Sequence, residues 1–87
     1  MDTTTPEGVY RTSDMYFAAY LKVAAVPFHD TVRVEDGARS KIVFEFHPHD
    51  MNSMRELKQQ YFSGQAKVSA QEYTQAIKMM KQLTHMG

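Results

Sequence analysis

A period-two alternation of apolar residues on both sides of an Asp-Gly turn constrains this chain more than any other feature. Between the two alternating runs lies Asp36-Gly37, a residue pair that favours a tight hairpin turn. The alternating apolar residues are Val32, Val34, Ile42, Phe44 and Phe46. The pattern predicts an antiparallel β-hairpin that presents these side chains to a core from one face.

The alternation also predicts how the two strands pair. To bring all the apolar side chains to one face, the residue numbers of paired positions must have an even sum. A sum of 76 pairs Val34 with Ile42, and it pairs His29 with His47. Either even register places on the opposite face the residues His29, Thr31, Arg33, Glu45 and His47.

A helix is predicted before the hairpin, roughly over residues 13–25. Thr12 or Ser13 is its expected N-cap, and Asp14 adds a favourable negative charge to the first turn. Pro27 disfavours helical geometry in the residue before it, so the helix should stop ahead of that position.

Two further helices are predicted after the hairpin. The first runs from about 51 to 62, capped by Asp50 and ended by Gly64. The second begins with the capping box Ser69-Ala70-Gln71-Glu72. The element order is therefore α-β-β-α-α, which predicts an α+β domain with an antiparallel hairpin packed against three helices.

The chain of 87 residues is long enough for one small core. Residues 1–10 lack periodicity and are predicted to form a flexible N-terminal arm, with residues 11–87 forming the single domain. The polar start does not resemble a signal peptide, and the run Met15 to Leu21 is too short to span a bilayer. Without cysteine, neither a disulfide nor a thiolate metal site is expected.

The segment His47-Pro48-His49-Asp50 is the stretch most suggestive of chemistry. His47 and His49, with His29 from the neighbouring strand, form the alternative of a metal site. A structural interpretation explains more of the residues, because Pro48 ends strand pairing and Asp50 caps the next helix. We therefore expect an exposed strand-to-helix corner and no bound metal. A role of the histidines in a binding surface is a further alternative.

Other catalytic patterns are weaker still. The four glycines are scattered and form no phosphate-binding loop, and no Ser-His-Asp set or acidic pair is specified. The net charge of zero argues against an unselective binder of polyanions. We expect a non-enzymatic protein with no cofactor, no small-molecule substrate and no membrane association.

The last predicted helix carries two candidate surfaces. Lys78, Lys81 and His85 share a flank that could contact nucleic-acid phosphates. Met79 and Met86 lie seven residues apart, at the edge of the apolar side of this helix that is expected to face the core. They suit an adaptable contact with a partner protein. The alternative is that the two methionines only widen the apolar side of the helix that packs into the core.

The first predicted helix is apolar nearly all round, whereas a surface helix usually has a polar face. The face expected to lie away from the core carries Met15, Ala18, Ala19, Ala25 and Val26, with Lys22 as one of few charges. We predict that Met15, Ala18, Ala19 and Lys22 pack against another chain, most simply a second copy in a two-fold homodimer. The alternative is that the N-terminal arm, with Val9 and Tyr10, folds over this face.

Four segments together resemble an uncharacterised family of small bacterial and phage proteins, a domain of unknown function. They are TSDMYFAAYLK, IVFEF, YFSGQAKVSAQEY and AIKMMKQL, and the resemblance covers roughly residues 10–84. Family members tend to have glycine where the first helix ends, whereas this chain has Ala25-Val26. The resemblance implies a bacterial or mobile-element origin and a compact stand-alone domain. We expect the protein to be associated with a phage or mobile element and to act in the cytoplasm of the bacterial host cell.

The function that best fits these observations is binding of a partner protein. In a phage or mobile-element setting, that could mean inhibition of a host defence or replication protein. The alternative is a small nucleic-acid-binding regulator that uses the basic flank of the last helix.

Overall fold

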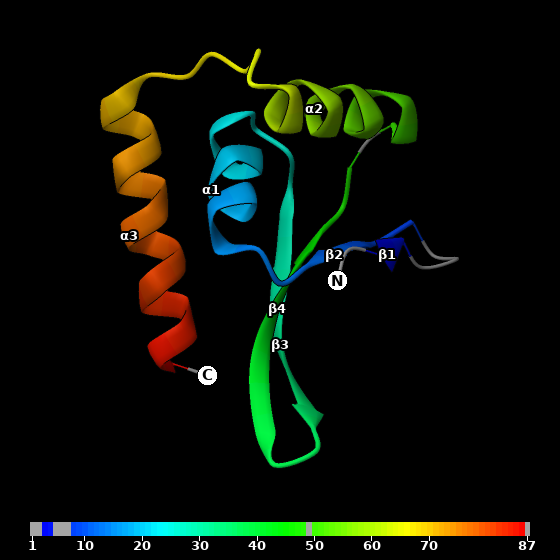
Figure 1. Ribbon diagram of the computed structural model, residues 1–87, viewed down its shortest axis with the longest axis vertical. Coiled ribbons are helices and arrows are strands. Elements are labelled where there is room, and N and C mark those ends of the chain that lie inside the picture. The colour runs from blue at the N-terminus through cyan, green and yellow to red at the C-terminus, as the bar shows by residue number, and fades with distance from the viewer. Residues whose placement is uncertain (1–2, 5–7, 49, 87) are drawn as a thin grey trace.

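The computed structural model describes residues 3–4, 8–48 and 50–86. Its elements, in chain order, are β1 (Thr3–Thr4), β2 (Tyr10–Thr12), α1 (Met15–Val23), β3 (Phe28–Asp36), β4 (Arg39–Phe46), α2 (Met51–Ser63) and α3 (Ala70–Met86) (Figure 1). The α+β class and the three helices are confirmed. The two short strands ahead of α1 were not predicted, and the division into a flexible arm and a domain remains a prediction.

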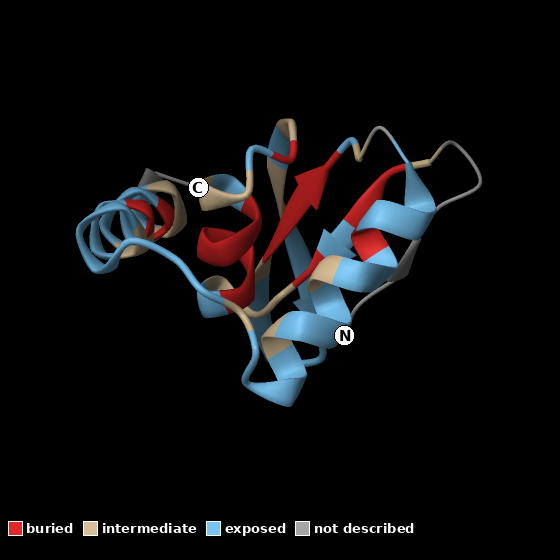
Figure 2. Ribbon diagram, turned by 90° about the horizontal axis from the view of Figure 1, so that it is seen from above, coloured by how far each residue is buried: buried red, intermediate tan, exposed pale blue. Residues whose placement is uncertain are grey.

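The strands form one antiparallel sheet in the order β1-β2-β4-β3. α1 lies between this sheet and α3, as two perpendicular views agree (Figures 1 and 2). The core is where these layers meet, and its buried residues come from β2, α1, β4, α2 and α3, with Val26 from the segment between α1 and β3. None of the helices in the described part of the chain is long and apolar enough to cross a membrane.

The predicted hairpin register is wrong. Asp36 pairs with Arg39 and Val32 with Val43, so the residue numbers of partners have an odd sum along most of the hairpin. The cause is the turn, because the two-residue loop Gly37–Ala38, with Gly37 at a φ of +65°, imposes an odd sum. As a result the valines of β3 face away from the side that carries Phe44.

A bulge corrects the pairing at the base of the hairpin. The register shifts between Phe28 and Asp30, leaving His29 as the extra residue, and Phe28 then pairs with Phe46. The rings of Phe28 and Phe46 meet edge to face, with centroids 5.4 Å apart. The bulge therefore returns an apolar side chain of β3 to the core side of the sheet.

The ends of α1 differ from the prediction. Asp14, expected in the first turn, is the N-cap, and its Oδ1 accepts hydrogen bonds from the backbone of Tyr16 and Phe17 at 3.0 and 3.1 Å. At the other end the helix stops at Val23, and Ala25 adopts the left-handed conformation with a φ of +64°. Glycine is the residue best suited to such a helix end, and alanine stands there in this chain.

The starts of α2 and α3 confirm the predicted caps. Asp50 Oδ1 accepts a hydrogen bond from the backbone of Asn52 at 3.0 Å, and Gly64 ends α2 at a φ of +80°. At α3, Ser69 Oγ accepts from the backbone N–H of Glu72 at 3.4 Å. α2 thus begins and ends close to the positions predicted from its capping residues, and α3 begins at the predicted capping box.

Candidate interaction surfaces

The face of α1 that was predicted to bind another chain is not available. Ala18 and Ala19 are both 0% exposed, because α3 packs on the side of α1 that is turned away from the sheet (Figure 2). Tyr73 of α3 donates a hydrogen bond from its hydroxyl to the Tyr16 carbonyl oxygen at 3.1 Å. The prediction missed the packing of α3 on this face, because nothing in the apolar pattern of α1 identifies which element packs on it.

The other residues predicted for the partner interface have different positions. Met15 is half-buried and packs against the core, whereas Lys22 and Met79 are exposed. Met86 belongs to α3, but its side chain lies outside the described part of the structure. Lys22 and Met79 are therefore the predicted contacts whose exposure suits a partner.

A groove between α1 and α3 brings these two residues together. This α1–α3 groove encloses about 290 Å³ and is lined by Lys22, Val23, Glu72, Gln75, Ala76 and Met79. Met79 is 44% exposed, while Ala76 in the floor is 5% exposed. The groove thus combines an apolar floor with one cation from α1 and one anion from α3.

The basic flank of α3 is also solvent-accessible. Lys78, Lys81 and His85 are all exposed, and their helical spacing places them on one side of α3. Ala76 and Met80 on the same helix are buried, so the core-facing side of α3 is separate from this flank. The three side chains can reach one extended anionic partner.

The histidines lie at a strand-to-helix corner. The rings of His29 and His47 meet edge to face with centroids 4.3 Å apart, and both residues are exposed. The pair was predicted as neighbours, although the bulge at His29, not the predicted register, brings the rings together. His49 lies outside the described residues, and within the described ranges no group of three His, Cys, Asp or Glu side chains could hold a metal ion.

Sequence reasoning missed a tyrosine-lined hollow beside the segment that joins α2 to α3. It encloses about 200 Å³, and its walls are Tyr20, Tyr61, Gly64, Ala66, Val68 and Tyr73. Burial, followed by a hydrogen bond with Tyr73, raises the pKa of the Tyr61 hydroxyl well above its ordinary range, and the charges of Tyr73 and Asp14 act in the same direction. Tyr61 therefore keeps its hydroxyl proton at alkaline pH values at which an ordinary tyrosine has lost it.

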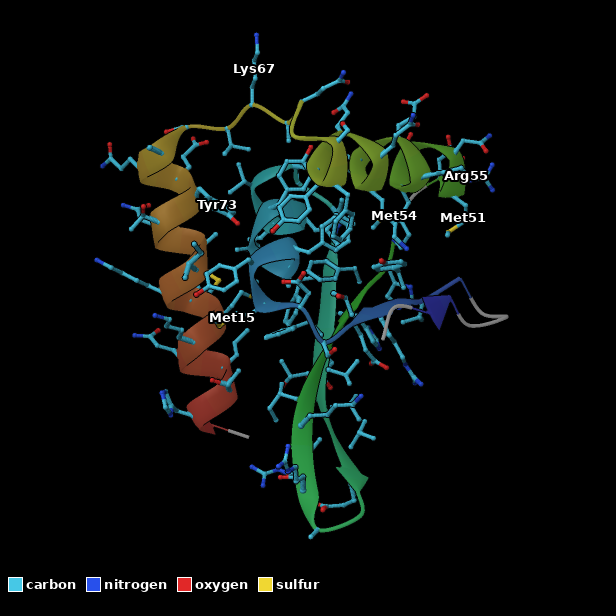
Figure 3. The ribbon with its side chains drawn as sticks, viewed as in Figure 1. Met15, Met51, Met54, Arg55, Lys67 and Tyr73 are labelled. Carbon is cyan, nitrogen blue, oxygen red and sulfur yellow. The ribbon has the colours of Figure 1, made fainter. Side chains whose placement is uncertain are left out.

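A second groove that the sequence did not indicate lies between α2 and β2. It encloses about 220 Å³, and its lining combines two cations with apolar side chains: Tyr10, Met51, Met54, Arg55 and Lys58. Three of these residues are labelled along α2 in Figure 3, on the far side of the molecule from α3. This groove and the α1–α3 groove are therefore separate surfaces.

Comparison with known protein families gives a match. The model of a family described as Domain of unknown function (DUF5659) matches residues 7–86. No curated protein and no solved structure matches the chain.

Proposed function

We propose that this chain, which belongs to the family described as Domain of unknown function (DUF5659), is a non-enzymatic interaction module that binds a partner protein through the α1–α3 groove. The observation that carries the proposal is the exposure of Met79 beside Lys22 over an apolar floor. Methionine is flexible and polarisable, and it recurs on surfaces that adapt to a partner.

The lining of the groove defines what kind of segment would fit. Val23 and Ala76 offer apolar contact, while Lys22 and Glu72 carry opposite charges. A partner helix with one apolar side chain, flanked by an acid and a base, would satisfy both the floor and the charges. Such recognition uses contacts within a preformed groove and requires no chemical step.

The resemblance to the family suggests where in the cell the protein acts. We place the protein in the cytoplasm of a bacterial cell, as part of a phage or mobile element. Inhibition of a host defence or replication protein is the form of partner binding that fits this setting best.

The experiment is site-specific photo-crosslinking in host cells, followed by mass spectrometry of the captured protein. A crosslinker at Met79 should capture one protein repeatedly, and Met79→Glu should abolish co-purification of that protein. Lys78→Glu, a neighbouring change on the exposed flank of α3, is the matched control and should leave it unchanged. Equal capture from positions 79 and 78, or binding that survives Met79→Glu, would refute the proposed groove.

The exposed flank of Lys78, Lys81 and His85 supports a second candidate, binding of nucleic acid. Contacts between lysine and phosphate weaken as the salt concentration rises. For two lysines, we expect a plot of the logarithm of the binding affinity against the logarithm of the salt concentration to have a slope of about −2. A fluorescence titration with duplex DNA at low salt tests this, since Lys78→Glu should weaken binding and Met79→Glu should not. Absence of binding at tens of micromolar protein would eliminate this candidate.

A further inference from the structure

The tyrosine-lined hollow is a feature that the proposed function does not use. It shares no lining residue with the α1–α3 groove, so an inference about it does not rest on the proposed function. Three of its walls are the rings of Tyr20 from α1, Tyr61 from α2 and Tyr73 from α3. Figure 3 labels Tyr73 on the side of α3 that faces α1. The hollow therefore gathers one aromatic ring from each helix.

The three rings are held in place by contacts within the chain. The centroids of the Tyr20 and Tyr61 rings lie 5.3 Å apart, and the hydroxyl of Tyr73 donates to the Tyr16 carbonyl oxygen at 3.1 Å. Tyr61 and Tyr73 are also joined by a hydrogen bond between their hydroxyls. A ligand would therefore lose little affinity to the ordering of these walls.

The hydroxyls of Tyr61 and Tyr73 offer lone pairs to a ligand. Each hydroxyl carries one hydrogen. Because Tyr73 donates its hydrogen to the carbonyl oxygen of Tyr16, Tyr61 is the donor in the bond between the two tyrosines. Both hydrogens are thus directed to protein oxygens, and what the hollow presents are oxygen atoms that can accept.

The charge distribution around the hollow favours a cation. Aromatic ring faces are negative, and α2 ends at Gly64 in the hollow wall, where the carboxyl end of a helix carries partial negative charge. The carboxylate of Asp14 is close enough to act on Tyr61 through its charge. Among the described residues that line the hollow none is basic, and the side chain of Lys67 points away from the molecule (Figure 3).

The start of α3 opposes this field only in part. The amino end of a helix is positive, and Val68 in the hollow wall lies close to it. However, Ser69 Oγ accepts a hydrogen bond from the backbone N–H of Glu72, and the Glu72 carboxylate adds a negative charge to the first turn. The negative contributions therefore outweigh the positive end of α3.

We infer that the tyrosine-lined hollow binds a methylated ammonium group, of the kind carried by choline and by a trimethylated lysine side chain. Rings arranged around such a cation are an effective means of binding it. The volume of about 200 Å³ suits one head group, because a cavity of about 150 Å³ holds benzene and pockets for drug-sized ligands start at about 300 Å³.

The apolar part of the wall favours methylated ammonium over the unmodified group. An unmodified ammonium is strongly hydrated and would have to give up water on entering the hollow. Methyl groups instead gain by leaving water, and Ala66 and Val68 offer them apolar contact. Methylation therefore matches the cation to both the rings and the apolar wall.

A comparison of choline with its neutral isostere, the alcohol in which carbon replaces nitrogen, separates charge from shape. The full chain is titrated with each and followed by NMR of the tyrosine ring protons, with sodium chloride as the control for ionic strength. Choline should shift the signals of Tyr20, Tyr61 and Tyr73 and bind about tenfold more tightly than the alcohol. Equal affinities, or no shift at tens of millimolar choline, would overturn the inference.

Charge changes at Val68 test the location of the site. Val68 is exposed, so both variants should remain folded, with circular dichroism as the check. Val68→Lys should weaken choline binding by about tenfold, and Val68→Glu should strengthen it, because a charge at the wall repels or attracts the cation. Lys67→Gln, next in the chain but directed outward, is the control and should change binding little. Weaker binding in both Val68 variants, or unchanged binding in both, would contradict the inference.

A ring substitution tests the role of the aromatic wall. Tyr61→Phe keeps the ring and should keep most of the choline binding, whereas Tyr61→Leu should lose it while the chain remains folded by circular dichroism. If a folded Tyr61→Leu variant binds choline as the wild type does, the ring is not part of the site.

Peptide titrations distinguish the two sources of the cation. A short peptide with trimethyllysine is compared with choline and with the same peptide carrying unmodified lysine. Tighter binding of the trimethyllysine peptide than of choline assigns the site to a modified partner protein, and the reverse order assigns it to a free small molecule. A preference for unmodified lysine over trimethyllysine would overturn the inference.

Discussion

Arg11 Nε lies 2.6 Å from Glu45 Oε2, and this ion pair ties β2 to the central strand β4. The Glu45 side chain is only 7% exposed, whereas that of Arg11 is 46% exposed. Arg11→Ala leaves a buried carboxylate without its cation, so we expect it to lower the free energy of unfolding by about 1–3 kcal/mol. Urea denaturation measures this, with Arg39→Ala, an exposed arginine at the hairpin turn, as the control. Equal losses in the two variants would contradict the role of the pair.

Replacing Ala25 by glycine should stabilise the protein. A residue with a Cβ in the left-handed conformation costs about 1–2 kcal/mol, and the greater freedom of glycine in the unfolded chain offsets part of the gain. The expected net increase in the free energy of unfolding is about 0.5–1 kcal/mol. Ala24, with a φ of −76°, provides the control, since Ala24→Gly should have the opposite sign. Two variants that shift the midpoint of thermal unfolding in the same direction would contradict this explanation.

Ala18→Glu should unfold the protein instead of dissociating a dimer. Ala18 is 0% exposed inside a single chain, so a carboxylate there would be buried without a partner. Circular dichroism should show loss of helix at any protein concentration. Tyr16→Glu, two residues earlier at a side chain that is 50% exposed, should remain folded. A folded, monomeric Ala18→Glu variant would show that α3 does not cover this face.

The stability of the protein should fall as the pH rises above about 10. Burial raises the pKa of Tyr61, so the unfolded chain loses this proton near the ordinary tyrosine pKa while the folded chain retains it. Because the unfolded state then binds fewer protons, the free energy of unfolding decreases with pH. In urea titrations at several pH values, Tyr61→Phe should show a shallower decrease than the wild type. Tyr16→Phe, which removes an exposed hydroxyl, should keep the wild-type slope.

Asp50→Ala should cost about 1 kcal/mol of stability, because the first backbone N–H groups of α2 lose their acceptor. Asp50 accepts from the backbone of Asn52 and from Ser53 Oγ at 3.0 and 3.3 Å. Asp50→Asn retains an N-cap acceptor and should cost much less. Similar losses in both variants would show that the charge of Asp50, and not its capping geometry, is what matters.

Local signals predicted the elements of this fold well. The caps Asp50 and Ser69 and the helix end at Gly64 depend on residues within four positions of each other, so the sequence shows them directly. The register of β3 and β4 could not be read from alternation, because the two-residue loop after Asp36 outweighed the preference for a single apolar face. The strand β2 has only three residues and leaves no periodic pattern.

The surfaces were harder to predict than the elements. Helical spacing placed Lys78 and Lys81 on an exposed flank, because that depends on one helix alone. The burial of Ala18 depends on contacts between residues more than fifty positions apart in the chain, such as that of Tyr73 with Tyr16. No local pattern contains this information, and the groove beside Met79 arises from the same contact between α1 and α3.

The position of α3 over Ala18 and Ala19 also has a consequence for biosynthesis. α3 leaves the ribosome after α1, the hairpin and α2, so a nascent chain exposes the apolar face of α1 until α3 has been made. Exposed apolar surface in incomplete chains promotes aggregation and attracts chaperones. Slow translation of residues 70–86 would prolong this exposure. The synthesis and packing of α3 therefore also end the period in which the nascent chain is prone to aggregate.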